Sequence, residues 1–331
     1  MPFSDIIGHK KQLESLRSGL ANNRLHHAYL FLGPDGVGKR TVALSLTKAI
    51  LCRVMSYDFC GQCGDCLRVQ NGNHPDVRVV ERLQKKNEIT IQQVRELERE
   101  LSYRSFTGGM KIAVLDPASL MNYPAQNALL KTLEEPPRDS LLILLSTSAG
   151  ALLTTLVSRC VRLSFAPLPA EEVAHFLTAR KGVPRAKAHL LATLSMGSLG
   201  RAVSAEIENM IERRAAWAER LSSLTAADSP AWMALAEEIA RDREGSLQFL
   251  EWAKLWYRDI LICQVTGNSR EASNPDLEDR IERQANKNSQ EQLLSLLSQA
   301  DAAAASIRRN FNRRMALENF LMKAWTLGPR L

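Results

Sequence analysis

Six cysteines occur in this chain of 331 residues, and four of them lie within residues 52–66, as Cys52, Cys60, Cys63 and Cys66. Thiolates separated by two residues can converge on one tetrahedral ion, and four of them complete its shell without leaving a position for water. In a cytosolic chain such clustering indicates a metal site rather than disulfides. The spacing therefore predicts a structural zinc module. The alternatives are four unliganded buried cysteines, or a DNA-reading zinc finger, for which no recognition helix with histidine ligands follows.

A glycine-rich loop precedes Lys39 and contains Gly33, Gly36 and Gly38. Glycines allow the backbone to curl so that successive N–H groups face a phosphate. The loop follows an apolar strand predicted at residues 28–32 and leads into a helix predicted at residues 41–51, whose N-terminus favours anions. Lys39 would reach the β- and γ-phosphates of a nucleotide. Together these features predict a P-loop nucleotide-binding site.

The residue after Lys39 departs from the P-loop pattern. That position requires Ser or Thr, whose hydroxyl binds Mg²⁺, and here it is Arg40. Thr41 lies about 100° further around the helix and should point elsewhere. The sequence therefore predicts phosphate contacts without the usual magnesium ligand.

Two further apolar runs, at residues 112–115 and 141–145, end on polar residues that include Asp116 and Thr147. Buried parallel strands carry their terminal side chains to the carboxyl edge of a sheet. We expect Asp116 to help hold Mg²⁺ through water, as the acid at the end of this strand does in P-loop proteins. The next residue, Pro117, has no group that could take a proton from an attacking water.

Residues 127–137, NALLKTLEEPP, and residues 158–160, SRC, closely resemble the bacterial DNA polymerase III clamp loader, a family of the AAA+ class of ATPases. The resemblance implies that Arg159 is a catalytic group in trans, which projects across a subunit boundary onto the ATP of a neighbour. Its planar fork of donors suits a γ-phosphate. The resemblance also implies that Thr147 senses the γ-phosphate. The alternatives are a surface arginine in an ion pair and a strand-end hydrogen bond.

Two subunit types of this family are compatible with these motifs. A delta-prime-type subunit carries the trans arginine without hydrolysing ATP, whereas a gamma/tau-type subunit is an active ATPase. Arg40, Pro117 and Gly200, which displaces Arg201 from the position of a nucleotide-contacting arginine, favour the first type, as does the chain length. ATP is then expected to bind weakly or to remain unhydrolysed, and enzymatic activity of the chain itself stays open. A zinc-dependent nucleic-acid-binding module without assembly partners is disfavoured by the helical regions described next.

These motifs require an α/β P-loop domain with a parallel sheet, which we place at residues 1–166 with the zinc module inserted at residues 52–66. Pro167 and Pro169 indicate a linker, and residues 167–205 resemble the small helical lid of AAA+ proteins. From residue 206 to 331 the apolar periodicity is helical, and this region resembles an all-helical collar by which clamp-loader subunits associate. Core or interface packing is expected for Trp217, Trp232, Trp252, Trp256 and Trp325.

Composition limits the classes of protein that fit. An apolar fraction of 45% is ordinary for a globular protein, and the net charge of +7 permits contact with nucleic acid or an acidic partner. No apolar run approaches the roughly 20 residues of a membrane span, and the N-terminus lacks a signal-peptide pattern, so we expect a soluble cytoplasmic protein without membrane contact. The resemblance implies gamma/tau and delta subunits as partners in a heteropentamer, and through it the sliding clamp and primed DNA.

Overall fold

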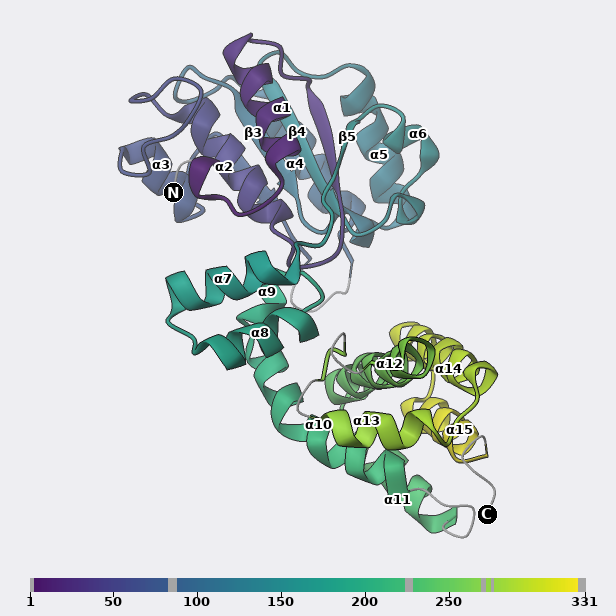
Figure 1. The fold of residues 1–331 in the computed structure, drawn as a ribbon. Coiled ribbons are helices and arrows are strands. Elements are labelled where there is room, and N and C mark those ends of the chain that lie inside the picture. The colour runs from purple at the N-terminus through teal and green to yellow at the C-terminus, as the bar shows by residue number, and fades with distance from the viewer. Residues whose placement is uncertain (1–2, 83–87, 224–228, 269–271, 275–276, 327–331) are drawn as a thin grey trace. The chain divides into compact units, whose positions relative to one another are not determined.

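The computed structural model describes residues 3–82, 88–223, 229–268, 272–274 and 277–326 (Figure 1). The chain divides into two compact units. The first comprises Met1–Phe176 with Met196–Gly200, and the second comprises Leu177–Ser195 with Arg201–Leu331. Residues of the predicted lid, 167–205, thus contribute to both units.

The first unit is built on a five-stranded parallel sheet with the strand order β2-β3-β4-β1-β5. The strands are β1 (Ala28–Leu32), β2 (Val77–Val80), β3 (Lys111–Leu115), β4 (Ser140–Ser146) and β5 (Val161–Ser164). Two interior strands, β3 and β4, are buried along their whole length, because helices cover both faces of the sheet (Figure 1). The predicted P-loop α/β fold is confirmed.

Alternate residues of the strands face two separate apolar cores, as the period of two in a strand requires. One core includes Phe31, Val114 and Ile143 and packs against α1 (Lys10–Ala21), α2 (Lys39–Leu51) and α3 (Gly64–Gln70). The other includes Leu30, Leu115 and Leu144 and packs against α4 (Ile91–Ser102), α5 (Tyr123–Glu134) and α6 (Thr154–Val157). Short 3₁₀ turns occur at Phe3–Asp5, Ala118–Leu120 and Ala149–Ala151.

Helix α5 shows how local sequence fixes an element next to the site. Its N-cap Asn122 accepts a hydrogen bond from the backbone N–H of Ala125 at 3.0 Å, and a proline stands in the first turn, where no N–H is needed. The helix ends at Glu134, just before the pair Pro136–Pro137, which cannot continue it. This helix therefore begins and ends where its own sequence dictates.

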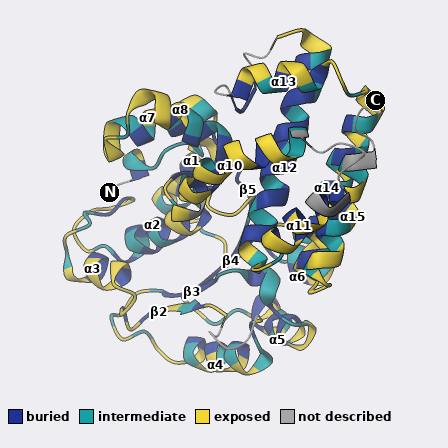
Figure 2. Ribbon diagram, turned by 90° about the horizontal axis from the view of Figure 1, so that it is seen from below, coloured by how far each residue is buried: buried dark blue, intermediate teal, exposed yellow. Residues whose placement is uncertain are grey.

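The described part of the second unit is helical. Its elements are the C-terminal part of α7 (Ala170–Lys181), α8 (Arg185–Leu194), the end of α9 (Leu199–Ala202), α10 (Ala205–Ser223), α11 (Ser229–Ile239), α12 (Arg243–Thr266), α13 (Glu278–Ala285), α14 (Gln290–Arg308) and α15 (Arg313–Thr326). Helix α12 carries buried residues from Gly245 to Cys263 (Figure 2). No helix among the described residues is long and apolar enough to cross a membrane.

Tryptophans form the centre of this helical unit. The rings of Trp252 and Trp256 stack at 5.8 Å, and Trp217 lies 5.4 Å from Phe249 in an edge-on arrangement. Trp232 is buried as well. The sequence predicts packing for these four tryptophans, and the side chain of the fifth, Trp325, lies outside the described part of the chain. The aromatic rings thus serve the core of the unit.

Candidate functional site

The glycine-rich loop joins the carboxyl end of β1 to the start of α2, as the sequence predicts for a P-loop. Gly38 is the N-cap of α2 with a φ of +112°, a conformation that other residues rarely adopt. At Gly33 the reason for glycine is close approach, since a Cβ there would lie 2.1 Å from the carbonyl oxygen of Phe165. The loop is thereby held in a tight curl around the first turn of α2.

Lys39 points back onto its own loop. Its ammonium donates to the carbonyl oxygen of Gly33 at 2.5 Å and to that of Pro34 at 2.8 Å, and it lies 3.9 Å from the carboxylate of Asp35. The residue is only 7% exposed, and this burial lowers the pKa of Lys39. The positive charge that the sequence assigns to a nucleotide is therefore in contact with backbone carbonyls.

The remaining carbonyls of the loop are also paired. The hydroxyl of Ser198 donates to Asp35 at 3.0 Å, the backbone N–H of Gly200 donates to Gly36 at 2.9 Å, and His9 Nε2 lies 2.8 Å from the carbonyl oxygen of Val37. A Cβ at position 200 would stand 2.9 Å from Gly36 Cα. The segment Met196–Gly200 thus rests directly on the loop within the first unit.

Arg40 contacts the acid that was expected to bind magnesium. Its Nη1 donates to Asp116 Oδ2 at 2.9 Å and also to the carboxylate of Glu81. Although partial burial opposes it, hydrogen bonding to these two carboxylates raises the pKa of Arg40. The guanidinium of Arg40, next to the P-loop, is therefore bound to Asp116.

Glu81 was not among the residues that the sequence singled out. It directly follows β2, just as Asp116 directly follows β3, and the register pairs Val80 with Leu115. The signal that could have found it is an acid at the end of an apolar strand, the same signal that identified Asp116.

Among Thr147, Thr41 and Pro117, which also belong to this edge, the sequence predicts a nucleotide contact only for Thr147. Thr147 follows β4 and is exposed, Thr41 is exposed on α2, and Pro117 follows Asp116. The residues present therefore do not fit a magnesium ion in the usual P-loop position, because Arg40 stands where a hydroxyl ligand is required and Asp116 is already bound to that arginine.

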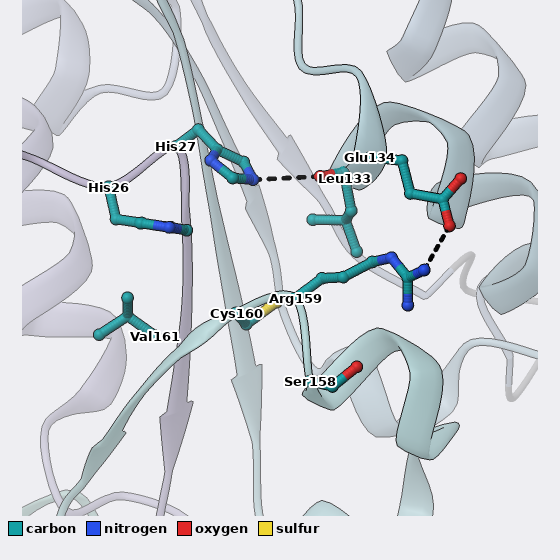
Figure 3. A pocket seen from close by; sticks show the side chains of 8 residues that line it. All are labelled: His26, His27, Leu133, Glu134, Ser158, Arg159, Cys160 and Val161. Atoms are coloured by element: carbon teal, nitrogen blue, oxygen red, sulfur yellow. Dashed lines mark hydrogen bonds and ion pairs between the residues drawn. The ribbon is translucent and has the colours of Figure 1, made fainter.

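Arg159 lies in a separate pocket of about 510 Å³ at the end of α5 (Figure 3). Its Nη2 lies 2.5 Å from Glu134 Oε1, and its Nη1 donates to the carbonyl oxygen of Thr155 at 2.8 Å. The same pocket contains His27, whose Nε2 lies 3.1 Å from the carbonyl oxygen of Leu133. The arginine is 36% exposed and is held at two points by its own chain.

The environment of His27 in this pocket disfavours its charged form. Burial, together with the adjacent His26, lowers the pKa of His27. The two rings lie 4.3 Å apart, and both line the pocket (Figure 3). Arg159 supplies the permanent positive charge of the pocket, because a guanidinium stays protonated in proteins.

The four clustered cysteines converge. Their sulfur atoms all lie within 4.8 Å of one another, and those of Cys52 and Cys60 are 3.8 Å apart. Cys63 is the N-cap of α3 and Cys66 lies in its first turn, so a turn followed by a helix start brings the last two thiols together. This donor set fits one tetrahedral metal ion.

Backbone N–H groups point at two of these sulfurs. Cys60 Sγ accepts from the N–H of Cys63 at 3.2 Å and from that of Gln62 at 3.5 Å, and Cys52 Sγ accepts from Met55 at 3.4 Å. These backbone hydrogen bonds lower the pKa of Cys60 to about 6. At Cys60 this favours the thiolate, the form that binds metal, whereas burial raises the pKa of the Cys66 thiol.

Comparison with known proteins agrees with the motifs along nearly the whole chain. A family model described as "DNA polymerase III, delta subunit" matches residues 8–169, and one described as "DNA polymerase III, delta subunit, C terminal" matches residues 208–325. The DNA polymerase III subunit delta' of Pseudomonas aeruginosa is 32% identical over 99% of this chain and 99% of its own. The chain belongs to the delta-prime family of DNA polymerase III subunits. The Bacillus subtilis delta' subunit is 28% identical over 94% of each chain.

The likeness of this delta-prime family member to gamma/tau subunits is partial. The tau/gamma subunit of Haemophilus influenzae is 33% identical over 181 residues, which cover 53% of this chain and 26% of that protein. Among solved structures, a gamma subunit-related protein from Thermotoga maritima superposes with a TM-score of 0.50 at 17% identity, over 96% of this chain and 99% of its own. That structure supports the fold. The delta-prime assignment rests on the full-length relatives.

Proposed function

We propose that this chain is a delta-prime-type subunit of a DNA polymerase III clamp loader and helps place a ring-shaped sliding clamp on primed DNA, with gamma/tau and delta subunits as its partners. The observation that carries the proposal is the full-length likeness to delta' subunits, which covers 99% of this chain, whereas the likeness to a tau/gamma subunit covers 53%. We assign nucleotide-binding-type, lid and collar roles to residues 1–166, 167–205 and 206–331.

In this role Arg159 acts on the ATP of a neighbouring subunit. Its pocket supports the proposal, because the guanidinium is partly exposed and its side chain is oriented by Glu134 and the carbonyl of Thr155. An arginine held by its own chain with one edge open can present its remaining donors to a phosphate. The P-loop of this chain is a separate site, where Arg40 contacts Glu81 and Asp116.

The chain itself does not hydrolyse ATP in this proposal. Pro117 removes the base, Arg40 replaces the magnesium ligand, and Lys39 contacts the carbonyls of its own loop. Any ATP bound through the Gly33, Gly36 and Gly38 loop would bind weakly. The four cysteines hold structural zinc, which the convergence of their sulfurs supports.

The experiment is a reconstitution with purified gamma/tau and delta subunits, sliding clamp and primed DNA. Clamp loading is expected to require this chain, while the isolated chain should turn over ATP at a negligible rate. Turnover by the isolated chain of about 1 per second, in the usual enzyme range, would instead support the gamma/tau type.

Replacement of Arg159 by Ala tests the trans role within that assembly. Arginine fingers contribute roughly 10³–10⁵ in rate at the site they serve, so DNA- and clamp-stimulated turnover at one neighbouring site should be lost. Fold, metal content and assembly should remain, because a partly exposed ion pair contributes about 0–1 kcal/mol to stability. Arg159→Lys should rescue poorly, since an ammonium cannot present two parallel donors.

A matched control is Arg104→Ala, which removes an exposed arginine from the loop after α4. It should load clamps at the normal rate. If Arg159→Ala also leaves clamp loading and turnover unchanged in an intact assembly, Arg159 is only a surface residue.

A further inference from the structure

Two acids lie side by side at the carboxyl edge of the sheet. The β2–β3 register pairs Val80 with Leu115, and the backbone N–H of Asp116 donates to the carbonyl of Val80 at 2.9 Å. Glu81 and Asp116 therefore leave the sheet as neighbours. Two adjacent carboxylates repel each other, and a cation placed beside both removes that repulsion.

Arg40 supplies this cation from the first turn of α2. One nitrogen, Nη1, donates to both acids, to Asp116 Oδ2 at 2.9 Å and to the carboxylate of Glu81. Three elements of the first unit, α2, β2 and β3, are thereby joined at one guanidinium. In a P-loop with Ser or Thr at this position, the hydroxyl and the acid after β3 would face a divalent metal ion.

The curl of the loop is likewise held by protein groups. Lys39, Ser198, Gly200 and His9 occupy its carbonyls, as described above. The conformation of the loop is therefore held by hydrogen bonds from groups of the chain itself. A guanidinium remains protonated at any physiological pH, and it cannot dissociate as a bound metal ion can.

We propose that Arg40 is a built-in cation that takes the place of the divalent metal at this edge and makes the P-loop region of the chain independent of magnesium. A metal ion approaching Asp116 would meet the positive charge of Arg40 and would have to break its hydrogen bonds. Arg40 is thus the residue that determines which cation this site accepts. The proposal concerns the isolated chain and does not depend on the assembly.

The experiment uses the full chain, purified with zinc supplied to its four clustered cysteines. Thermal unfolding is recorded with and without millimolar Mg²⁺, and Mn²⁺ binding is followed by electron paramagnetic resonance as a probe of the same site. The wild-type protein should melt at one temperature in both conditions and should take up no Mn²⁺ at this edge.

Arg40→Thr restores the hydroxyl and leaves the two acids without their cation. It should melt about 2–4 °C lower than the wild type without divalent ions, the shift expected for loss of about 1 kcal/mol. Addition of Mg²⁺ should raise its melting temperature back to the wild-type value. It should also bind Mn²⁺, and addition of Asp116→Asn should abolish this binding. Arg40→Lys keeps the charge and should remain insensitive to Mg²⁺.

Two results would overturn the proposal. One is Mn²⁺ binding by the wild-type chain that Asp116→Asn removes. The other is an Arg40→Thr variant that melts like the wild type and does not respond to Mg²⁺. If Arg40→Thr does not fold, Arg40→Gln is neutral, similar in length to arginine, and subject to the same melting criterion.

Discussion

The cysteine cluster and the P-loop lie in the same unit and use their ligand groups in opposite ways. In the cluster, four sulfurs approach within 4.8 Å of one another, and two of them, those of Cys52 and Cys60, accept hydrogen bonds from backbone N–H groups. Around the P-loop, the ammonium of Lys39 faces carbonyls and the guanidinium of Arg40 faces carboxylates. The cysteine cluster brings together four metal ligands of one kind, which an external cation must hold together. The P-loop region pairs its opposite charges within the chain.

This difference predicts at which of the two sites the replacement of a side chain costs more stability. A site of like donors depends on its ion for its fold. A site of paired charges depends on the chain's own contacts, each of which contributes far less. Three substitutions, taken in order of decreasing effect, examine the two sides of the comparison.

The double substitution Cys60→Ser, Cys63→Ser should have the largest effect. Metal binding to closed thiolate sites is coupled to folding, with apparent free energies of about 10–16 kcal/mol in zinc-finger peptides. We expect the purified protein to contain zinc, the variant to lack it, and residues 52–76 to lose their protection from hydrogen exchange. Cys263→Ser, in the helical unit, is the control and should retain the metal. A folded, monodisperse wild-type preparation free of zinc would rule out the zinc assignment.

Lys39→Met should have an intermediate effect, and on stability rather than on activity. It removes two hydrogen bonds from a charged donor, so the free energy of unfolding should fall by about 1.5–3 kcal/mol. ATP turnover of the assembled clamp loader should change little, because this P-loop lacks a catalytic base. Urea unfolding and turnover measure the two quantities.

The control for Lys39 is Lys10→Met, which changes an exposed lysine at the start of α1. It should alter neither quantity. If turnover collapses in Lys39→Met while the assembly stays intact, this subunit hydrolyses ATP and the contrast with the cysteine cluster fails.

Gly200→Ala should have the smallest effect of the three. Its Cβ would lie 2.9 Å from Gly36 Cα, so segment Met196–Gly200 would have to shift away from the loop, at a cost of about 1–3 kcal/mol for such overpacking. Gly150→Ala is the control, since a Cβ there meets its nearest neighbour at an ordinary 3.6 Å. Equal melting temperatures for both variants would mean that the segment does not close onto the loop.

Much of the fold could be predicted from the sequence because its strands are apolar runs between clear turn signals. The expected strand at residues 28–32 coincides with β1, and those at residues 112–115 and 141–145 lie within β3 and β4. Strand β5 (Val161–Ser164) was missed, because it is a short edge strand whose residues are mostly exposed and show no apolar run. Its place beside β1 depends on pairing between distant segments.

The buried polar network of the helical unit shows the same limit. Arg214 Nη1 donates to Asn274 Oδ1 at 3.0 Å, and Asn274 Nδ2 donates to Asp259 Oδ2 at 2.8 Å. All three residues are buried, yet each would be read from the sequence as an ordinary surface residue of a helix or loop. Only the packing of α10 and α12 makes them partners.

By itself, the sequence determined the types and spacing of the groups: four thiols, the loop glycines with Lys39, an acid after β3, and Arg159 within SRC. These are local patterns, and local geometry is enough to read them. The tertiary structure decided what each charge faces. Arg40 read as the loss of a magnesium ligand, and only the parallel pairing of β2 with β3 set Glu81 beside Asp116 and made that arginine their partner. Register between strands depends on contacts across the sheet, which residue spacing along one segment does not contain.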